Sequence, residues 1–545
     1  MMKKLLALML ALILALAVCA PALADAKVVK TDYTGKTIIL HTNDVHGAID
    51  GYACIPTLRD WFFDHGAQLV LVADAGDFSQ GTTYVSTNKG LAAIEMMNAA
   101  GYDVVTLGNH EFDFGYAQLM ENLEQATFET ISANVLLDNG VSILSGYVIF
   151  ANQDLKIAFV GLETPETATK VNPGLIQEIH FTAFNDLYDC AQAAVDAVRE
   201  EADIVIGLWH LGVDKESAAN GYRSIDVLNK VEGVDFVIDG HSHTVMTEGE
   251  GGEPIQSTGT KFAHIGVIVI DNETKAIEDH FLVDTAGIEK DAEVLAKAQA
   301  IMDEVNEKYG AVFATSEVEL NGAKAPGNRT EETNLGDLIT DAMVWSVVKE
   351  GGIEQVEPNQ VVGITNGGGI RAAIAQGDVT MNDINTVLPF GNTVAVVYVT
   401  GEEMLEALEA STFCTPDAIG GYPQTSGIEW TLDTTKAYDQ GELYYKLNGD
   451  PTSYYGPASI QRVTITAING EPFDPEATYA VVTNDFCQTG GDTYNVFKNA
   501  YVAGNAFDTG IPMDEAVMAY ITDVLNGVVT AEAYGAPRGS ETQIK

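Results

Sequence analysis

The sequence has few basic residues. Its 545 residues include 28 Lys and Arg against 78 Asp and Glu, which gives a formal net charge of −50 at pH 7. Nucleic-acid polymers are bound by Lys and Arg that neutralise their phosphates, so this composition excludes such a polymer as a partner. The acidity is typical of a protein that must stay soluble outside the cell, and it indicates no particular reaction.

Cysteine is also scarce. Beyond Cys19 there are only Cys54, Cys190, Cys414 and Cys487, widely separated and without a C-x-x-C pair. This spacing excludes a disulfide scaffold and a cysteine-rich zinc site, and we expect buried thiols. Cys414 and Cys487 remain a possible pair in an oxidising compartment, if the fold brings them within bonding distance.

After the N-terminal segment, the sequence has no apolar run long enough to anchor the chain in a membrane. The N-terminus itself has Lys3 and Lys4, the apolar run Leu5 to Val18 and then Ala22-Leu23-Ala24, the three regions of a secretory signal. Because the run is shorter than the ~18 to 20 residues that span a bilayer, we expect cleavage and no transmembrane anchor.

We therefore predict that residues 1–24 form a signal peptide and that the mature protein is secreted, to an extracellular or periplasmic location. Lipid anchoring at Cys19 is an alternative. The segment Leu16-Ala17-Val18-Cys19 resembles a lipobox only in part, because Val precedes Cys where a small residue is usual.

The rest of the chain divides into two regions joined by a helical pattern. From Thr37 to about Val283, apolar strand-like runs alternate with helical patterns, which is typical of a layered α/β domain. The stretch Asp291 to Tyr309 has an apolar stripe at helical spacing, with Asp291 as cap and Gly310 as stop. A second domain begins near Phe313. Its predicted elements are strands at Val361–Ile364, Val394–Val399, Val463–Ile465 and Tyr479–Val482, and a helix opened by the capping box Thr400-Gly401-Glu402-Glu403.

Polar side chains follow five apolar runs of the first region. After Val104–Leu107 comes Gly108-Asn109-His110-Glu111-Phe112-Asp113, where we expect Gly108 to allow a sharp turn. The other four runs are followed by Asp44 and His46, by Asp77, by His210, and by His241 and His243. In an open α/β sheet the carboxyl ends of the strands share one rim. Asp, Asn and His gathered there make a site for zinc, manganese or a similar divalent ion, and a shared carboxylate would make it binuclear.

Each of these residues also has an ordinary structural explanation. An Asp after a strand is commonly a turn residue or a helix cap, and a single His is commonly a satisfied core or surface imidazole. The set as a whole is harder to explain by chance, because the chain has 10 histidines and five of them stand directly beyond apolar runs.

The order and spacing of these residues resemble the signature of the calcineurin-type metallophosphoesterases. The matching segments are Asp44-Val45-His46, Gly76-Asp77, Gly108-Asn109-His110-Glu111, His210 and Gly240-His241-Ser242-His243. Over nearly its whole mature length the chain is similar to the secreted two-domain 5′-nucleotidases, a family that includes bacterial periplasmic UDP-sugar hydrolases and animal ecto-5′-nucleotidases.

The resemblance implies an α/β fold in three parts. We expect a four-layer αββα metallophosphoesterase domain at residues 30–285, a linker helix at 286–312, and a separate mixed α/β substrate-binding domain at 313–540.

The resemblance also implies the site residues of the first domain. Asp77 would bridge two divalent ions, zinc or manganese, with one shell completed by Asp44, His46 and His243 and the other by Asn109, His210 and His241. Bacterial members have Gln or Asn at the position of His243. His110 would stabilise the transition state without binding metal, and Asp113 would orient and charge it.

In the second domain, the glycines of Asn366-Gly367-Gly368-Gly369-Ile370-Arg371 allow backbone amides to approach a ligand, and Arg371 offers a planar fork for phosphate. The resemblance assigns Asn366, Arg371 and Arg329 to nucleotide binding. One bacterial pattern has a further arginine where this chain has Ala325.

Two aromatic residues, Phe390 and Phe486, stand in expected loops flanked by turn formers. They either plug those loops or, as the resemblance implies, sandwich a nucleobase. Asp492 matches the carboxylate that accepts ribose hydroxyls.

The predicted function is metal-dependent hydrolysis of nucleoside 5′-monophosphates to nucleoside and phosphate, with water activated by the two ions. Alternatives within enzymes are a UDP-sugar or dinucleotide hydrolase and a 2′,3′-cyclic-nucleotide phosphodiesterase. An alternative from another class is a non-catalytic nucleotide-binding surface protein. Since the arginines and the ions lie on different domains, we expect the domains to close over the substrate.

Overall fold

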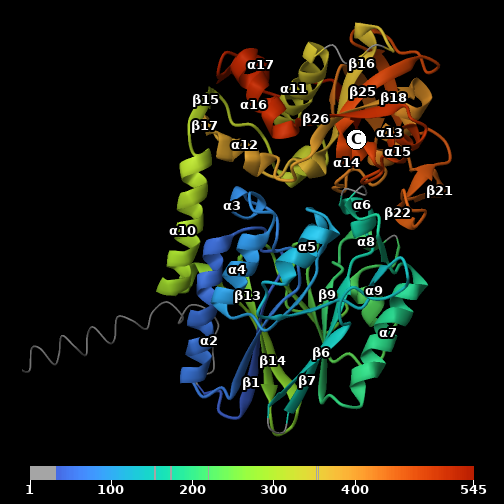
Figure 1. Cartoon of the computed structure of the whole chain (residues 1–545). Coiled ribbons are helices and arrows are strands. Elements are labelled where there is room, and N and C mark those ends of the chain that lie inside the picture. The colour runs from blue at the N-terminus through green and yellow to red at the C-terminus, as the bar shows by residue number, and fades with distance from the viewer. Residues whose placement is uncertain (1–31, 153–154, 172–174, 219, 351–352, 354) are drawn as a thin grey trace, which may run out of the picture.

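The computed structural model describes residues 32–152, 155–171, 175–218, 220–350, 353 and 355–545. The predicted signal peptide and Cys19 lie outside the described residues. Two domains are stacked on one another, with helix α10 (Ala292–Tyr309) along one side of the join (Figure 1). Within the described part of the chain, no helix combines the length and apolarity needed to cross a membrane.

The first domain contains two six-stranded sheets packed face to face. The first sheet has the order β14 (Ala276–Asp284), β13 (His264–Asp271), β1 (Lys36–Thr42), β2 (Leu69–Asp74), β3 (Val104–Thr106) and β4 (Glu129–Ile131). The second has the order β11 (Val245–Met246), β12 (Ile255–Thr258), β10 (Phe236–Asp239), β9 (Ile204–His210), β7 (Leu155–Glu163) and β6 (Tyr147–Asn152).

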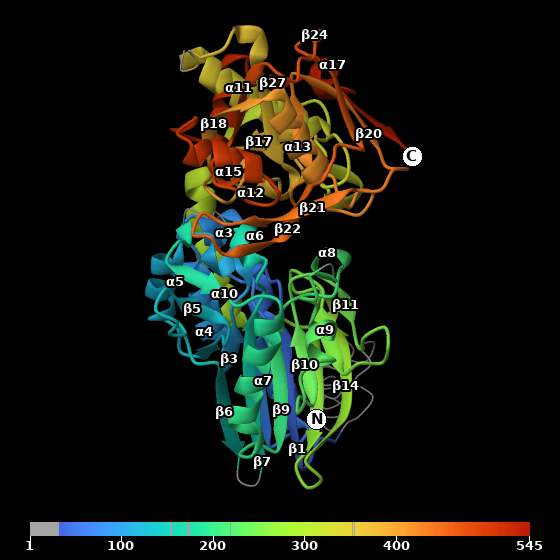
Figure 2. The same ribbon diagram turned by 90° about the vertical axis from the view of Figure 1, so that its right-hand side faces the viewer.

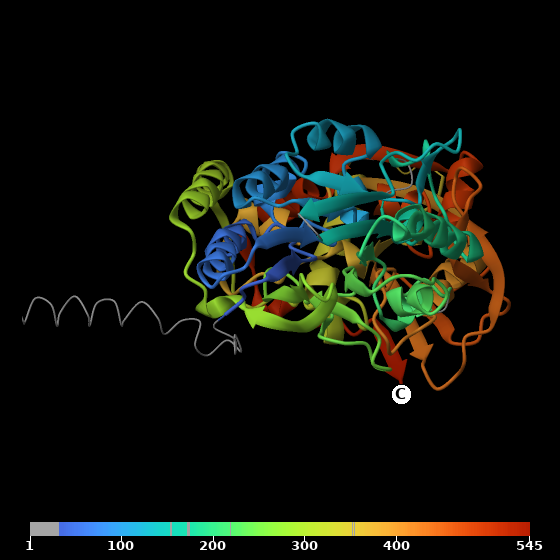
Figure 3. The ribbon, with the colours of Figure 1, turned by 90° about the horizontal axis from the view of Figure 1, so that it is seen from below.

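Alternation along β1 explains the layering. Ile39 faces the core between the two sheets, whereas Ile38 and Leu40 face the core beneath the helices. The first sheet is covered by α2 (Cys54–Asp64), α4 (Leu91–Ala100) and α10, and the second by α7 (Asn185–Arg199) and α9 (Ser224–Leu228). Seen from below, the sheets lie between these helices (Figure 3). The predicted αββα architecture is confirmed.

One expectation drawn from the apolar runs was wrong. The five runs that precede the polar residues do not belong to one open sheet, because β1, β2 and β3 lie in the first sheet and β9 and β10 in the second. The rim is formed by the carboxyl ends of two facing sheets. An unbroken apolar run is buried on both faces in either arrangement, so its pattern does not distinguish a helix-covered sheet from a sandwich.

Helix α10 packs on the first domain. The Asp291 carboxylate accepts hydrogen bonds from the Glu293 and Val294 amides at 3.0 and 2.9 Å, as expected for its cap. Val294 and Ala298 are buried in the core beneath the first sheet. The predicted apolar stripe thus fixes the helix to one domain, and the chain leaves for the second domain at Gly310.

The second domain is built on a five-stranded sheet with the order β19 (Pro423–Ser426), β16 (Val361–Asn366), β25 (Thr478–Asn484), β18 (Thr393–Thr400) and β26 (Ala506–Pro512). Helices α11 (Asn334–Glu350) and α16 (Met513–Asp523) cover one face, and α13 (Gly401–Ser411) and α15 (Asn495–Val502) cover the other. A four-stranded sheet of β24 (Glu471–Pro472), β23 (Val463–Ile468), β20 (Ile428–Asp433) and β28 (Glu541–Ile544) lies beside them.

The strands and the helix cap predicted for this domain are confirmed. All four predicted strands are present, and Thr400 and Glu403 form the expected capping box, with Glu403 Oε2 accepting from the Thr400 amide at 2.7 Å. Cys54 and Cys487 are buried as expected, whereas Cys190 and Cys414 are partly exposed, and no disulfide joins Cys414 to Cys487.

Contacts between the domains occur on both sides of the join. On one side, Thr83 Oγ1 lies 3.2 Å from Thr386 Oγ1. On the other, the hairpin of β21 (Gln440–Tyr445) and β22 (Pro451–Pro457) lies against the first domain near α6 (Thr167–Lys170), where the Asn220 amide donates to the Ser453 carbonyl at 2.7 Å (Figure 2). His180 also bonds Asp450 across this side. The structure is therefore a closed arrangement of the domains.

Candidate metal centre and substrate pocket

The loops that follow β2 and β3 touch each other at the rim. Gly76 has φ +90°, which turns the chain after β2, whereas Gly108 is extended with φ −108°. A Cβ at Gly108 would lie 2.4 Å from Asp77 Oδ1. The expectation that Gly108 serves a sharp turn was wrong, because its lack of a side chain instead lets the two loops approach.

The backbone at the rim is strained. Asp44, His46, Asp77, His241 and His243 have φ of 50°, 45°, 63°, 78° and 54°, a region that residues other than glycine seldom adopt. Such strain persists only where the surrounding structure fixes it, and it gathers at functional sites. All five residues belong to the predicted metal set.

The first cluster consists of Asp44, His46, Asp77 and His243, whose donor atoms converge. His46 Nε2 lies 2.9 Å from His243 Nε2, which in turn lies 3.4 Å from Asp44 Oδ1. Burial lowers the pKa of both imidazoles well below its usual value, so they are neutral. Neutral imidazole is the form that binds metal.

The second cluster consists of Asp77, His210 and His241. His210 Nδ1 lies 2.6 Å from the Ala75 carbonyl and donates to it, which directs Nε2 toward Asp77 Oδ2 at 3.2 Å. This buried Nε2 has no hydrogen-bond partner among the described residues. Asn109 adds an amide oxygen 2.9 Å from His241 Nδ1.

Asp77 stands between the clusters. Its Oδ2 faces His46 Nε2 at 3.7 Å and His210 Nε2 at 3.2 Å, while Oδ1 accepts from the His110 amide at 2.9 Å. Burial raises the pKa of this carboxyl, but the neighbouring histidines lower it by more, and the net pKa lies well below its usual value. A buried carboxylate that shares one oxygen between two sets of oxygen and nitrogen donors fits two divalent ions.

Glu111 holds these loops, a role that the sequence analysis missed. Its carboxylate accepts hydrogen bonds from the amides of Asp77, Phe78, Ser79 and Gly108 at 2.6 to 3.0 Å. Its spacing of three residues after Gly108 is that of a capping box, which offered a local signal.

His110 and Asp113 form the predicted pair. His110 Nδ1 lies 2.7 Å from Asp113 Oδ2, so Nε2 is the atom that faces the second domain, 3.5 Å from Arg371 Nη2. Burial lowers the pKa of His110 to about 3 and raises that of Asp113. The His110 ring also stacks on Phe390, with centroids 5.6 Å apart.

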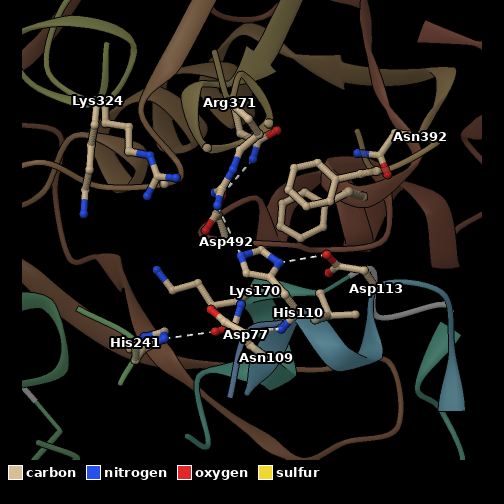
Figure 4. Close-up of a pocket in the computed structure, with 18 of the residues that line it drawn as sticks. Asp77, Asn109, His110, Asp113, Lys170, His241, Lys324, Arg371, Asn392 and Asp492 are labelled. Carbon is tan, nitrogen blue, oxygen red and sulfur yellow. Dashed lines mark hydrogen bonds and ion pairs between the residues drawn. The ribbon is translucent and has the colours of Figure 1, made fainter. Parts of the chain in front are cut away.

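One pocket is lined by both domains (Figure 4). From the first domain it takes Asp77, Asn109, His110, Asp113, His241 and His243, and from the second Arg329, Asn366, Arg371, Phe390, Phe486 and Asp492. Asp44, His46 and His210 are buried beside these residues. All predicted site residues are thus brought together.

The second-domain wall carries positive charge. Burial, and then the neighbouring Arg329, lowers the pKa of Arg371 to about 10. Two neighbouring guanidinium groups suit a phosphate ligand. Lys324 also lines the pocket, next to Ala325, and Lys170 lines it from the first domain. Neither lysine was predicted, although Lys324 adjoins the position where an arginine is missing.

The remaining wall residues come from a strand end, a turn, a loop and a short helix. Asp492 has φ 48° and accepts from the Asn366 side chain at 3.0 Å. Phe390 lies in a loop as predicted, but Phe486 lies in the short helix α14 (Asp485–Gln488). The predicted loop was wrong because the Asn484 side chain caps this turn by accepting from the Cys487 amide at 2.7 Å.

Comparisons with known proteins agree with this geometry. Residues 37–245 match the family model for calcineurin-like phosphoesterases, and residues 312–499 match the model for the 5′-nucleotidase C-terminal domain. The structure resembles that of a 5′-nucleotidase precursor from Thermus thermophilus, with a TM-score of 0.75, 27% identity and coverage of 94% of this chain and 99% of that one.

Two relatives differ in the share of their own length that this chain covers. The trifunctional nucleotide phosphoesterase protein YfkN of Bacillus subtilis is 30% identical over 518 residues, which cover 85% of this chain but 32% of that protein. The human 5′-nucleotidase is 27% identical over 535 residues, covering 89% of this chain and 88% of the relative. The chain therefore belongs to the two-domain 5′-nucleotidase family of calcineurin-like metallophosphoesterases, and it is a phosphoric-ester hydrolase.

Proposed function

We propose that this enzyme hydrolyses nucleoside 5′-monophosphates to nucleoside and inorganic phosphate. The observation that carries the proposal is the composition of its pocket, which joins the two donor clusters and His110 to a pair of arginines and a pair of phenylalanine rings. A phosphate monoester of a nucleoside has chemical groups that match each part.

Seven residues would hold two divalent ions: Asp44, His46 and His243 on one side, Asn109, His210 and His241 on the other, and Asp77 between them. When bound, such ions polarise the phosphoryl group and make water a better nucleophile. The donor set suits zinc and manganese alike.

The phosphate would be held by Arg371 and Arg329. Arg371 already lies within 3.5 Å of His110 Nε2, so an anion held by this guanidinium sits beside the imidazole. Asp113 fixes the ring through Nδ1 and leaves Nε2 to face the phosphate. A dianionic phosphate next to His110 favours its protonated form, which stabilises charge in the transition state.

The nucleoside would occupy the other side of the pocket. Phe390 and Phe486 offer aromatic faces to a base, which are worth ~1 to 3 kcal/mol per stacked base. Asp492, held by Asn366, offers a carboxylate to ribose hydroxyls. These groups would align the ester bond with the ions and His110.

A broader substrate range is the second candidate. Lys170 and Lys324 add two cations to the pocket beyond the arginines, which favours substrates with more than one phosphate, such as UDP-sugars and dinucleotides. The name of the Bacillus subtilis relative, a trifunctional nucleotide phosphoesterase, also describes more than one nucleotide activity. A 2′,3′-cyclic-nucleotide phosphodiesterase shares the same donor clusters. A non-catalytic binding protein is disfavoured, because the donor set and the His110–Asp113 pair are complete.

The test is a substrate panel. Purified protein loaded with zinc or manganese is given AMP, UDP-glucose, NAD, 2′,3′-cyclic AMP and p-nitrophenyl phosphate, with and without chelator. We expect the highest kcat/KM for AMP and no turnover after chelation. A higher kcat/KM for any other nucleotide would replace the proposed substrate.

We also propose the domain boundaries 30–285, 286–312 and 313–540, and secretion after removal of residues 1–24. Edman sequencing of protein recovered from the producing organism tests the second point. An N-terminus close to Asp25 is expected, and retention of Lys3 and Lys4 would contradict it.

A further inference from the structure

A buried glutamate lies behind the second donor cluster, and the proposed function gives it no role. Glu166 precedes helix α6 and is 1% exposed. Its Oε2 lies 3.0 Å from Nε2 of His241. The two residues are 75 positions apart in the sequence, so the contact is made only by the fold.

Both ring nitrogens of His241 are therefore engaged. Nδ1 faces the Asn109 amide oxygen at 2.9 Å, on the side of the cluster, and Nε2 faces Glu166. An ionised carboxylate only accepts hydrogen bonds. A carboxylate is a stronger acceptor than the Asn109 amide oxygen, so it favours the tautomer with hydrogen on Nε2 and leaves Nδ1 with a lone pair for an ion in the cluster.

His210 shows the opposite arrangement. Its Nδ1 donates to the Ala75 carbonyl, so that Nε2 is the nitrogen directed into the same cluster. Two histidines of one cluster thus present different nitrogens, and each is fixed by a different acceptor. Partners of this kind typically set the orientation and the basicity of a ligating histidine.

We propose that Glu166 is a positioning residue that fixes the tautomer and orientation of His241 for the second ion. This inference rests on the proposed two-ion function. The inference concerns His241, whose Nε2 contacts a buried carboxylate. It does not concern His210, whose Nδ1 contacts a backbone carbonyl.

Glu163 provides a matched control. It is also a buried glutamate, three residues earlier at the end of β7, and it accepts a hydrogen bond from Thr167 Oγ1. Burial raises the pKa of Glu163 well above its usual value, so Glu163→Gln exchanges a neutral carboxyl for an amide in the same part of the fold and leaves the Glu166–His241 contact in place.

The experiment measures ion binding and not turnover. Apo protein is titrated with zinc against a competing chelator for the parent, Glu166→Ala, Glu166→Gln and Glu163→Gln. Loss of such a partner typically weakens metal affinity ~10- to 100-fold. We expect that loss for the second ion only in Glu166→Ala, a smaller loss in Glu166→Gln, whose amide oxygen still accepts from Nε2, and less than ~3-fold in Glu163→Gln.

A second readout separates positioning from folding. In ¹⁵N NMR spectra of the apo protein, we expect His241 to carry hydrogen on Nε2 in the parent, to populate both tautomers in Glu166→Gln, and to carry hydrogen on Nδ1 in Glu166→Ala, where the Asn109 amide oxygen is the remaining acceptor. Second-ion affinity within ~3-fold of the parent in a folded Glu166→Ala protein would overturn the inference. A parent protein that binds no second ion would instead overturn the proposed function.

Discussion

The two sides of the pocket are built in different ways. On the first-domain side, the functional groups follow strand ends of two facing sheets and are held by strained backbone and by buried hydrogen bonds, such as those that Glu111 accepts from four amides. On the second-domain side, they come from a strand end, a loop and short turns, and only Asp492 among them has a left-handed backbone. Under the proposed function, the first side carries out the chemistry and the second selects the ester.

The largest effect is expected at Asp77, the group shared by both clusters. Asp77→Asn removes the charge that holds two ions, so both ions and nearly all turnover should be lost for AMP and p-nitrophenyl phosphate alike. Elemental analysis and phosphate release measure the two quantities. Two ions per chain with near-parental rates would show that Asp77 does not bridge.

Asp74 offers the control for this substitution. It is buried three residues earlier, where it accepts from Thr42 Oγ1 and the Gly76 amide, and burial raises its pKa to about 8. The carboxyl is therefore mostly protonated at neutral pH, and Asp74→Asn should retain both ions.

The next largest effect is expected at His110. Its substitution tests whether catalysis and ion binding depend on different residues of the first-domain side. His110→Ala should keep both ions, because neither of the two donor clusters described above includes it. Turnover of both substrates should fall ~10²- to 10⁴-fold, the usual worth of a positioned acid–base group. Steady-state kinetics and elemental analysis test this, and loss of one ion would make His110 a ligand.

A third prediction concerns the join between the two sides. Thr83→Cys with Thr386→Cys replaces two hydroxyls that lie 3.2 Å apart and should allow a disulfide that locks the closed arrangement. Because both domains line the pocket, product release should require their separation. Steady-state turnover in the oxidised protein should fall tenfold or more and recover with reductant. Unchanged turnover in fully cross-linked protein would remove domain opening from the cycle.

The smallest effect is expected at Asp492, on the second-domain side. Asp492→Ala removes hydrogen bonds worth ~0.5 to 1.5 kcal/mol, so kcat/KM for AMP should fall ~2- to 12-fold. The matching 2′,3′-dideoxynucleotide lacks the hydroxyls and should be affected less. Equal losses for both nucleotides would assign Asp492 a structural role through Asn366.

Much of this arrangement was predictable, because local patterns carry it. Apolar runs followed by Asp or His located the rim, and the cap at Asp291 and the box at Thr400 located helix starts. The hydrophobic pattern within an apolar run did not show to which of the two first-domain sheets that strand belongs. They also did not reveal Glu166, whose only sign is a contact across 75 residues, or the Asn484 cap that turns Phe486 into a helix.

The division between chemistry and selection is tested most directly by a comparison of AMP with p-nitrophenyl phosphate in three variants. Phe486→Ala is the sharper probe on the second-domain side, because Phe390 also stacks on His110. The third variant, His110→Ala, belongs to the first-domain side.

Loss of one base-stacking ring corresponds to ~1 to 3 kcal/mol. We therefore expect Phe486→Ala to lower kcat/KM for AMP ~5- to 160-fold and to leave p-nitrophenyl phosphate near the parent rate, with a similar but less selective loss for Phe390→Ala. His110→Ala should lower both substrates by the same factor. A parallel decline of AMP and p-nitrophenyl phosphate in Phe486→Ala would contradict the account, because the ring would then support the fold and not select the nucleoside.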